Sequence, residues 1–454
     1  MVKVRFAPSP TGNLHVGNAR TAVINYLFAR KEKGRLCLRI EDTDIERSER
    51  GYELSIIEDL RWLGIDWDEG PIRQTERLDI YKRYAHTLLD MGLAYRCFCT
   101  REDIERMRWS SLSKGIAPRY SGRCRDLSGD TAEAFIREGR GYVVRFRSFM
   151  EPVTFNDIIH GAVSFPHDHV DDFIIIRSDG IPSYNFAAAV DDMLTGITHV
   201  IRGADHISNT PKQIMLFRAL EGAQPIYAHH SLFTGKDKKP LSKRQGITGI
   251  KDFRAMGIVK EALINYLAIT GRSLEREFMS EEELINTFEL HSLSRSDSFF
   301  DPEKLLWLNR EHLRRMPAER LMKEAGLPFD YREKIEALKE NVQTLNELRE
   351  FMVIFDGDSI DSDALDFVLR VKDIGMIMTI MEDLIKKQPG AGFDDIFTYL
   401  NTCLSLPRKD LMMTLRVILT GKKSGPPIKD IFPLIARDSI IKRLECLKRN
   451  LSTD

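Results

Sequence analysis

Short apolar runs alternate with helical patterns through the first 95 residues of the chain. The run Val2–Phe6 contains β-branched residues and predicts a strand, and the stretch Asn18–Lys33 after it is compatible with a helix. Apolar side chains recur at helical spacing in Ser48–Leu63 and Glu76–Met91, and a glycine follows each stretch directly. Strands that alternate with helices predict a parallel α/β sheet.

The pattern changes twice further along the chain. Residues 96–190 contain short strand-like runs and turn signals, which we interpret as an α+β insertion between two halves of one sheet. From residue 251 onward helical periodicity dominates, with breaks at Asp356–Asp363 and Gly421–Pro427. The predicted domains are the first half of the sheet domain (1–95), the insertion (96–190), the second half of the sheet domain (191–250), a small helical domain (251–319) and an α-helical domain (320–454).

Composition narrows the class of protein. The 454 residues are enough for several domains, and a hydrophobic content of 43% supplies ordinary cores. No apolar run is long enough to predict a membrane span, and no signal peptide is expected before the first strand. The six cysteines are sparse and irregular, which fits a reducing cytosol. A net charge of −1 does not by itself indicate a nucleic-acid partner.

A turn rich in proline follows the first predicted strand. Residues 4–17 read Val-Arg-Phe-Ala-Pro-Ser-Pro-Thr-Gly-Asn-Leu-His-Val-Gly, and His15 stands where the next helix is expected to begin. Backbone N–H groups and the positive end of the helix dipole gather at such a position, which suits a polyphosphate group. A second segment, Pro-Leu-Ser-Lys-Arg at 240–244, lies in a loop rich in glycine and lysine far down the chain.

These two segments resemble the ATP-binding motifs of class I aminoacyl-tRNA synthetases, and the chain resembles bacterial glutamyl-tRNA synthetase over essentially its whole length. Further segments carry the resemblance: Arg39–Asp44, Tyr184–Phe186, Val190–Asp192, His199–Gly203, Glu261–Leu267, Lys304–Asn309 and Leu415–Gly421. The resemblance implies a Rossmann-type α/β catalytic domain, split by an insertion that contacts the acceptor end of tRNA. A helical stem-contact domain (251–319) and an all-α anticodon-binding domain (320–454) are implied after it.

The implied activity is that of a monomeric, cytosolic ligase. L-Glutamate attacks the α-phosphate of ATP in the presence of Mg²⁺, and the glutamyl group then passes to the 3'-terminal ribose of tRNA-Glu. Neither step needs a protein nucleophile, so the enzyme has to align the reactants and stabilise charge on phosphate oxygens. Whether tRNA-Gln is also charged stays open.

The resemblance places ATP on the proline-rich turn and the lysine segment, with His15 and Lys243 as catalytic residues. A histidine can donate to a phosphate oxygen, and a lysine can follow the charge that develops on the transferring group. The competing interpretations are a histidine that caps a turn and a surface lysine cluster. The implied ATP-binding set is Pro8, Ser9, Pro10, Thr11, Gly12, His15, Gly17, Asn18, Asp205, His206, Leu241, Ser242, Lys243 and Arg244.

Glutamate needs groups that pair with two carboxylates and one ammonium. An arginine can bind a carboxylate with two hydrogen bonds, and we predict Arg202 for the side-chain carboxylate and Glu41 for the α-ammonium. The competing interpretation of Arg5 and Glu41 is a structural ion pair at the edge of the sheet. The implied glutamate-binding set is Arg5, Ala7, Ser9, Glu41, Tyr184 and Arg202.

Three cysteines form a candidate metal site. Cys97 and Cys99 are two positions apart and can clamp one ion, and Cys124 can add a third thiolate. Resemblance to zinc-bearing members of the family implies Tyr120 as the fourth ligand, and we expect one structural Zn²⁺. The alternative is three thiols left over from a lost site.

Four rival functions differ in what the sequence should contain. A glutamyl-queuosine tRNA synthetase-like enzyme resembles only the catalytic half, whereas helical landmarks continue here to the end. Glutaminyl-tRNA synthetase favours β-barrels in its tail. A dinucleotide-binding oxidoreductase needs a G-x-G-x-x-G after a strand, and none is present. A catalytically inactive tRNA-binding regulator has no need of His15 and Lys243.

Overall fold

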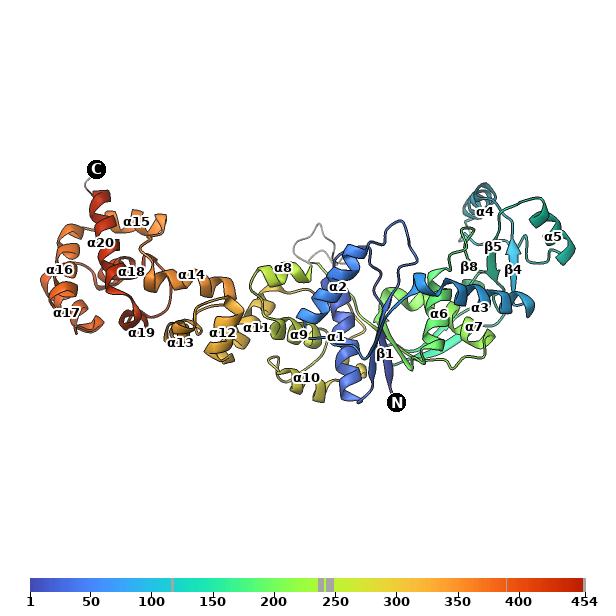
Figure 1. The fold of residues 1–454 in the computed structure, drawn as a ribbon, viewed down its shortest axis with the longest axis horizontal. Coiled ribbons are helices and arrows are strands. Elements are labelled where there is room, and N and C mark those ends of the chain that lie inside the picture. Colours follow the sequence, from blue (N-terminus) through green and yellow to red (C-terminus); the bar gives the residue numbers. More distant parts are fainter. Residues whose placement is uncertain (116–117, 236–240, 242–248, 389, 452–454) are drawn as a thin grey trace. The chain divides into compact units, whose positions relative to one another are not determined.

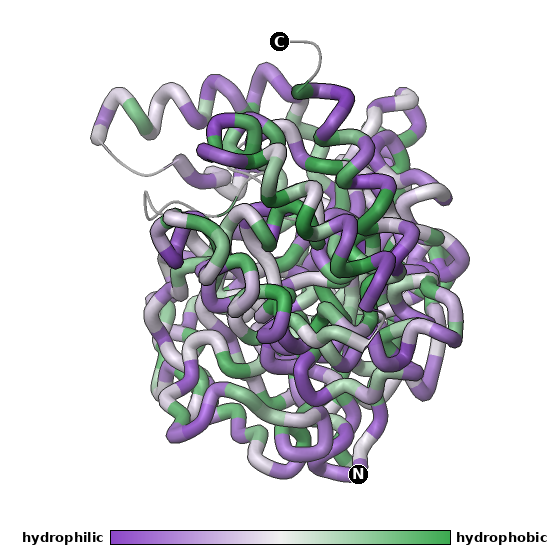
Figure 2. The backbone as a smooth tube through the Cα atoms, turned by 90° about the vertical axis from the view of Figure 1, so that its left-hand side faces the viewer, coloured by the Kyte–Doolittle hydropathy of each residue, from purple (hydrophilic) through white to green (hydrophobic). Residues whose placement is uncertain are grey.

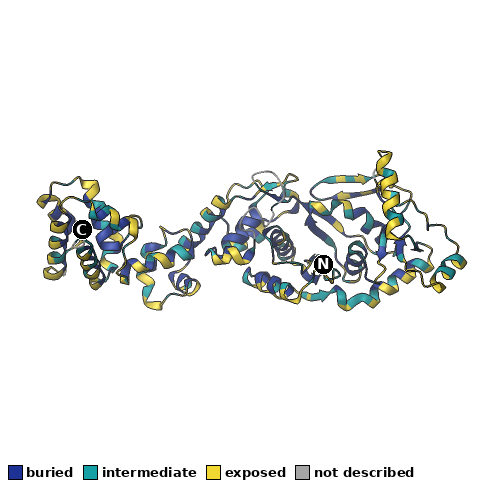
Figure 3. Cartoon of the chain, turned by 90° about the horizontal axis from the view of Figure 1, so that it is seen from above, coloured by how far each residue is buried: buried dark blue, intermediate teal, exposed yellow. Residues whose placement is uncertain are grey.

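The computed structural model describes residues 1–115, 118–235, 241, 249–388 and 390–451 (Figure 1). The chain divides into two compact units. The first contains Met1–Asp252 and Ile264–Phe300, and the second contains Phe253–Leu263 and Asp301–Asp454. Buried residues, dark blue in Figure 3, follow the strands and the inner helix faces, while exposed residues lie along the outer faces.

A parallel three-stranded sheet opens the first unit, with the strand order β1-β2-β3. Its strands are β1 (Lys3–Phe6), β2 (Arg35–Ile40) and β3 (Glu69–Arg73), connected by α1 (Val16–Lys31) and α2 (Arg50–Trp62). The connecting helices are long enough for parallel crossovers, as the alternation in the sequence predicts. Gly64 has a φ of 75° and takes the left-handed conformation after α2, where a glycine costs least.

A second sheet has the strand order β7-β6-β10-β9. Its strands are β6 (Val153–Asp157), β7 (Gly161–Phe165), β9 (His199–Gly203) and β10 (Ile226–His230), and α6 (Tyr184–Leu194) and α7 (Thr210–Ala219) lie in the same part of the chain. Strand β10 is parallel to both β6 and β9. The Thr198 N–H, just before β9, donates to the carbonyl oxygen of Lys3 at 2.9 Å, so β9 starts beside β1. The carboxyl ends of β1 and β9 therefore come together.

A small antiparallel sheet, β4-β5-β8, belongs to the predicted insertion. Its strands are β4 (Ala94–Cys97), β5 (Val143–Phe146) and β8 (Ile174–Ile176), and it is accompanied by α3 (Leu78–Asp90), α4 (Arg101–Ser113) and α5 (Gly129–Arg137). Side chains of this sheet share one apolar core with α3, α6 and α7. Because β6 and β7 also pair with β10, the predicted limits at residues 95 and 190 do not coincide with the edges of a sheet.

The remaining elements of the first unit are short. Strands β11 (Phe233–Thr234) and β12 (Ser298–Phe299) pair in parallel. The helices and turns here are α8 (Ile250–Ala255), α10 (Glu281–Thr287), η1 (Gln74–Arg77), η2 (His167–His169), η3 (Ala204–Asn209) and η5 (Leu290–Ser292). Helix α8 and helix α9 (Lys260–Ile269) each contribute residues to both units.

The second unit consists of helices in its described residues. They are α11 (Pro302–Arg315), α12 (Ala318–Ala325), α13 (Arg332–Leu338), α14 (Leu345–Asp356), α15 (Ser362–Leu369), α16 (Ile374–Lys387), α17 (Phe393–Cys403), α18 (Arg408–Thr420), α19 (Ile428–Ile431) and α20 (Arg437–Leu451), with the turns η6 (Phe329–Tyr331) and η7 (Phe432–Leu434). The predicted breaks at 356–363 and 421–427 are loops after α14 and α18. The division between the units at residues 300 and 301 lies before the predicted limit at 319.

Two local differences from the sequence pattern have simple causes. The pattern that begins at Glu76 starts as the 3₁₀ turn η1, and the α-helix begins only at Leu78. The last helix is preceded by α19 and η7, whose prolines at 427 and 433 break the helical run. Hydrophobic and hydrophilic positions intermingle along the helices in Figure 2, and none of the described helices is long and apolar enough to cross a membrane.

Candidate active site

A cavity of about 500 Å³ lies where the strands β1, β2, β9 and β10 end, beside the start of α1. Crevices at the carboxyl ends of parallel strands are the usual ligand sites of such sheets. All six predicted glutamate-binding residues line this cavity: Arg5, Ala7, Ser9, Glu41, Tyr184 and Arg202. Of the predicted ATP-binding residues, Pro8, Ser9, Thr11, Gly17, Asn18, Asp205 and His206 also line it. Pro10, Gly12, His15 and Leu241 are not part of the lining, and Ser242, Lys243 and Arg244 lie outside the described residues.

His15 is the N-cap of α1. Its Nδ1 accepts a hydrogen bond from the Gly17 N–H at 3.1 Å, so the capping interpretation of this histidine is correct as far as Nδ1 is concerned. An acceptor at Nδ1 means that the neutral ring carries its proton on Nε2. The cap therefore leaves His15 with the tautomer that can donate to a phosphate oxygen at the positive end of α1.

Gly17 faces the cavity without being required by packing. A Cβ added at this position would meet only the Nδ1 atom of His15, at 3.6 Å, which is an ordinary contact distance. The protein itself therefore has room for a side chain here. A glycine at such a position is explained by a ligand that approaches the backbone closely.

Two described positions on either side of residues 242–248, Leu241 and Gly249, form hydrogen bonds or backbone pairs beside the cavity. The Leu241 N–H donates to the carbonyl oxygen of Phe233 at 3.2 Å. At the other end Gly249 forms an isolated antiparallel bridge with His15, and the Ile250 N–H donates to the carbonyl oxygen of Leu14 at 3.1 Å. Leu241 thus contacts the cavity wall, and Gly249 and Ile250 contact the predicted phosphate-binding turn.

A buried ion-pair network forms the floor of the cavity. Asp192 accepts from Arg5 Nε at 3.3 Å and from Arg39 Nη1 at 2.5 Å, so one carboxylate bridges two arginines. Arg39 Nη2 also donates to Glu41 Oε1 at 2.9 Å. Burial would raise the pKa of Asp192, yet Arg39 and Arg5 bring this pKa below its usual value. Arg5 and Glu41 are thus both in buried ion pairs, as their competing interpretation predicts, but Arg5 pairs with Asp192 and Glu41 pairs with Arg39.

Glu41 keeps one carboxylate oxygen for a ligand. The hydrogen bonds from Arg39 go to Oε1, and no described residue donates to Oε2. Burial raises the pKa of Glu41, against the opposing effect of Arg39. An ammonium group at Oε2 would favour the ionised carboxylate, which matches the predicted role of Glu41 toward the α-ammonium of an amino acid.

Arg202 differs from Arg5 and Arg39 in its partners. Its side chain is buried, with 4% of the residue exposed. Nε donates to His229 Nε2 at 3.1 Å, and Nη2 donates to Thr210 Oγ1 at 2.9 Å. Among the described residues no Asp or Glu forms an ion pair with its guanidinium, whereas Arg5 and Arg39 share Asp192. A buried cation without an acidic partner, on the wall of a cavity, can pair with a carboxylate of a ligand.

Tyr184 and His206 connect Arg202 to the predicted nucleotide side of the cavity. The Tyr184 hydroxyl lies 3.4 Å from Arg202 Nη1 and 3.3 Å from His206 Nδ1. Burial raises the pKa of Tyr184, so its hydroxyl keeps its proton. Burial lowers the pKa of His206 to about 4, so its ring is neutral at pH 7 and can accept at Nδ1. The tyrosine hydroxyl can thus accept from the arginine and donate to the histidine.

Sequence reasoning missed residues of the cavity wall and of the buried ion-pair network beside it. Arg39 belongs to a quoted motif but received no role, although a charged residue inside the apolar run Leu36–Ile40 was a signal of a buried partner. Arg20, which is 1% exposed, donates to the carbonyl oxygens of Ser231 and Thr270. Further lining residues without an assigned role are Phe6, Thr21, Thr43, Asp44, Gly203, Asn209, His230, Ser231, Leu232 and Phe233.

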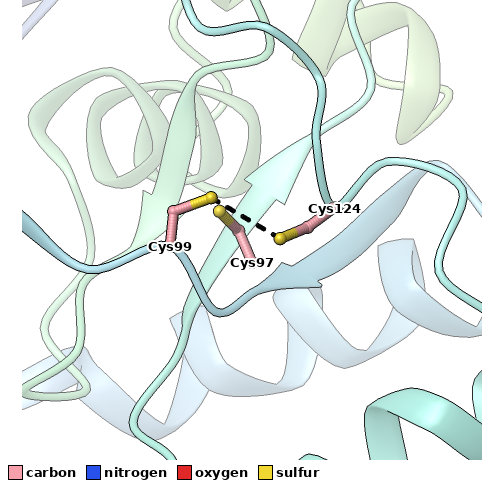
Figure 4. Close-up of side chains that lie close together, drawn as sticks. All are labelled: Cys97, Cys99 and Cys124. Atoms are coloured by element: carbon pink, nitrogen blue, oxygen red, sulfur yellow. Dashed lines mark hydrogen bonds between the residues drawn. The ribbon is translucent and has the colours of Figure 1, made fainter. Parts of the chain in front are cut away.

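The three predicted metal-binding cysteines meet in space. Cys97 ends β4, Cys99 follows it, and Cys124 comes from a turn, so that their sulfur atoms lie within 4.8 Å of one another (Figure 4). Cys99 Sγ lies 3.6 Å from Cys124 Sγ, close to the roughly 3.8 Å that two thiolates on a tetrahedral zinc would have. The Tyr120 hydroxyl lies 3.2 Å from Cys97 Sγ and 3.7 Å from Cys99 Sγ. The cluster can therefore hold a metal ion, with the tyrosine oxygen at the fourth position.

A positive charge lies beside this cluster. The Arg145 guanidinium lies over the Tyr120 ring, 3.9 Å from its centre. Three thiolates and a phenolate would carry four negative charges, and a divalent ion would offset only two of them. Arg145 supplies part of the remaining compensation, which favours the deprotonated ligand set.

Comparison with known proteins agrees with this geometry. A family model described as the catalytic domain of class I tRNA synthetases (E and Q) matches residues 1–307, and one described as an anticodon binding domain matches residues 302–448. The chain is 41% identical to a glutamate–tRNA ligase of Carboxydothermus hydrogenoformans, an alignment that covers 98% of this chain and 99% of the relative. It is also 41% identical to a glutamate–tRNA ligase of Aquifex aeolicus, with 99% of both chains covered.

A solved structure leads to the same family. The crystal structure of a glutamate tRNA ligase from Elizabethkingia meningosepticum, in complex with its amino acid, superposes with a TM-score of 0.84 at 29% identity over 99% of both chains. The match extends over the α/β unit and the helical unit alike. With the family models and the relatives of similar length, it shows that the chain belongs to the glutamate–tRNA ligase family of class I tRNA synthetases, which use ATP.

Proposed function

We propose that this chain activates L-glutamate with ATP to glutamyl-adenylate and transfers the glutamyl group to the 3'-terminal ribose of tRNA-Glu. The observation that carries the proposal is Arg202, a buried guanidinium on the cavity wall without an acidic partner among the described residues. The side-chain carboxylate of glutamate is the counter-charge that this position lacks. Because an amide cannot supply that charge, the arginine favours glutamate over glutamine.

The cavity offers a separate group to each part of the amino acid. Glu41 Oε2 accepts from the α-ammonium, and Arg202 receives the side-chain carboxylate. The start of α1 faces the triphosphate, with Gly17 leaving room for it and His15 donating from Nε2. Lys243 would add positive charge at the transferring phosphoryl group, and Mg²⁺ would accompany the ATP phosphates. The enzyme thus works by alignment and charge stabilisation.

The helical unit supports a role in binding the anticodon arm of tRNA. A cavity of about 550 Å³ on this unit is lined by Arg408, Lys409 and Arg416 together with methionines and Ile428. Cations can hold the RNA backbone while unstacked anticodon bases pack on apolar side chains. This unit argues against a glutamyl-queuosine tRNA synthetase-like enzyme. We expect the protein to act as a monomer in the cytoplasm, and its six free cysteines fit a reducing compartment.

Changing Arg202 tests the proposed function directly. We expect Arg202→Ala to raise the KM for glutamate by about 10²-fold, because a charge-assisted pair of roughly 2–4 kcal/mol is lost. The KM for ATP should change little. The measurement is charging of tRNA-Glu and tRNA-Gln transcripts by the intact and altered chains, with melting temperatures recorded in parallel. Arg218→Ala, at an exposed position of α7, is the matched control.

Two results would contradict the proposal. Equal losses in the use of glutamate and ATP would assign Arg202 to folding and not to substrate binding. Failure of the intact chain to charge an unmodified tRNA-Glu transcript would favour the queuosine-type enzyme or an inactive tRNA-binding regulator. Pyrophosphate exchange would then separate these two, since only the former activates glutamate.

We also propose that Cys97, Cys99, Cys124 and Tyr120 hold one structural Zn²⁺. The sulfur separations and the position of the tyrosine oxygen support this, as does the charge of Arg145. The site is built on the end of β4, so a bound ion would tie the turn at Cys124 to the small antiparallel sheet. It lies outside the cavity lining.

Metal content provides the test of this site. We expect about one zinc per chain after purification without added metal, and zinc affinity should fall at acidic pH because protons compete for the thiolates. Cys124→Ser should lose the ion, whereas Cys403→Ser, at an exposed cysteine of the helical unit, should retain it. Elemental analysis of the three proteins gives the answer. A metal-free intact chain with three readily titratable thiols at these positions would identify a vestigial site.

A further inference from the structure

Three neighbouring strands carry a series of hydrogen-bonded polar side chains that ends at Arg202. Asp157 is the last residue of β6, His229 lies on β10, and Arg202 lies on β9. The strand order β6-β10-β9 brings the three residues close together. His229 is the direct pairing partner of Arg202, and Asp157 pairs with Tyr227, two residues before His229 on β10. All three are buried, with 3%, 0% and 4% of each residue exposed.

The hydrogen bonds in this series define which ring nitrogen of His229 holds the proton. Asp157 Oδ2 lies 2.6 Å from His229 Nδ1, and His229 Nε2 lies 3.1 Å from Arg202 Nε. Arginine can only donate, so Nε2 of the histidine must accept and the proton of the neutral ring must sit on Nδ1. That N–H points at the carboxylate. The arrangement is a carboxylate that orients a histidine, which in turn orients an arginine.

The charges are consistent with this assignment. Burial lowers the pKa of His229, and the positive charge of Arg202 acts in the same direction against the effect of Asp157. Burial opposes ionisation of Asp157, but its bonds to His229 and to backbone N–H groups bring its pKa below the usual value. Asp157 is therefore an anion, and His229 is neutral. The His229 ring separates the Asp157 carboxylate from the buried guanidinium of Arg202. The carboxylate therefore offsets part of the positive charge without forming an ion pair with the arginine.

Nη1 is the nitrogen of the Arg202 guanidinium that is best placed to meet a ligand. Nε and Nη2 are engaged by His229 and Thr210 within the protein core. Among the described residues Nη1 meets only the Tyr184 hydroxyl, at 3.4 Å, which is a long hydrogen bond. A direct ion pair with an acidic residue would compete with a substrate carboxylate for the guanidinium. A neutral histidine acceptor holds the arginine in place without forming an ion pair with it, so the guanidinium can still pair with a ligand carboxylate.

We propose that Asp157 and His229 are positioning residues that hold Arg202 in the orientation needed to select a carboxylate side chain on the amino-acid substrate. This inference rests on the proposed role of Arg202 in glutamate binding and assigns its support to two residues outside the cavity lining. The histidine tautomer set by Asp157 is essential. If the proton moved to Nε2, two N–H groups would face each other and Arg202 would turn away.

Asp157→Asn tests the tautomer with little change in shape. In one orientation the asparagine NH₂ group faces the N–H at His229 Nδ1. In the other it faces the backbone N–H groups of Ile159 and His160, so two donors face each other in either case. His229→Gln keeps an acceptor toward Arg202 but loses the link to Asp157. We expect each variant to raise the KM for glutamate roughly tenfold or more, with the KM for ATP within about twofold of the intact chain. The ratio of glutamate to glutamine use should fall.

The control is another histidine of the same sheet. His199 lies on β9, is bonded to Thr198 Oγ1 and stands edge-on to Phe28, away from the cavity lining. His199→Gln should lower the melting temperature without separating the two KM values. A combined change, Asp157→Asn in an Arg202→Lys chain, adds a second readout. If Asp157 acts through Arg202, it should add little to the glutamate KM once the arginine is gone.

The outcomes are distinguishable from those of the proposed function. If the intact chain charges tRNA-Glu but Asp157→Asn and His229→Gln raise both KM values in parallel, as expected of a structural loss, the positioning role is wrong and the proposed function stands. Full additivity of Asp157→Asn with Arg202→Lys would also overturn it. If the intact chain charges no tRNA-Glu, both proposals fail. Variants too unstable to assay singly would assign the pair to folding and would count against a positioning role.

Discussion

Lys243→Ala is expected to slow the formation of glutamyl-adenylate by about 10²-fold or more, because a preorganised positive charge at the transferring phosphoryl group is removed. Lys243 itself lies outside the described residues. The expectation rests on the family motif and on the anchoring of the segment at Leu241 and Gly249, beside the cavity and the His15 turn. Glutamate binding should be nearly unchanged, since the cavity residues that pair with the amino acid remain.

Single-turnover adenylate formation, with glutamate binding measured separately, checks this expectation. Lys239→Ala is the matched control, because it removes a neighbouring lysine of the same segment that the motif does not require. Turnover close to that of the intact chain in Lys243→Ala would exclude the lysine from the chemistry. An equal loss in both variants would point to the net charge of the segment as the cause.

The second large effect concerns stability. Asp192→Asn should cost roughly 3–5 kcal/mol of folding free energy, because Arg5 and Arg39 would be left buried and close together without the anion they share. The side chains of the three residues are at most 5% exposed, so water cannot replace that charge. Since the carboxylate has a depressed pKa, its contribution is present at neutral pH and is lost as the pH falls into the acid range.

Urea denaturation of the intact and altered chains measures this loss. Asp79→Asn removes one partner of the exposed Lys82–Asp79 pair, with side chains that are 53% and 95% exposed, and should cost less than about 1 kcal/mol. If Asp192→Asn cost no more than this control, the bridge between the two arginines would contribute nothing to the fold.

Local patterns in the sequence predicted the elements of the catalytic unit better than its contacts. The strand at Val2–Phe6 and the helices before Gly64 and Gly92 are found nearly where expected, because each depends on neighbouring residues and on a glycine stop. The pairing between distant strands could not be predicted in this way. Strands β6 and β7 join the catalytic sheet by pairing with β10, and such long-range pairing leaves no mark in the local pattern.

The same contrast applies to the cavity. The family motifs predicted which residues line the glutamate-binding part of the cavity, but they did not predict which of these residues form ion pairs with each other. Arg5 meets Asp192, and Glu41 meets Arg39, across separations that a linear pattern cannot show. His229 and Asp157 drew no attention in the sequence, since a lone histidine and a lone aspartate have no spacing that marks them. Only the strand order makes them neighbours of Arg202.

The alignment of β6, β10 and β9 has a consequence for how specificity can change. Arg202 lies opposite His229 in the backbone ladder, and Asp157 reaches His229 from a position opposite Tyr227, so the contacts of all three depend on the register of β10. A slip of one residue in β10 would bring Ala228 or His230 opposite Arg202 and turn the His229 ring to the other face of the sheet. Substrate choice is thus encoded partly in main-chain pairing. An insertion or deletion in the loop before β10, far from any substrate atom, could alter it as effectively as a change in the cavity wall.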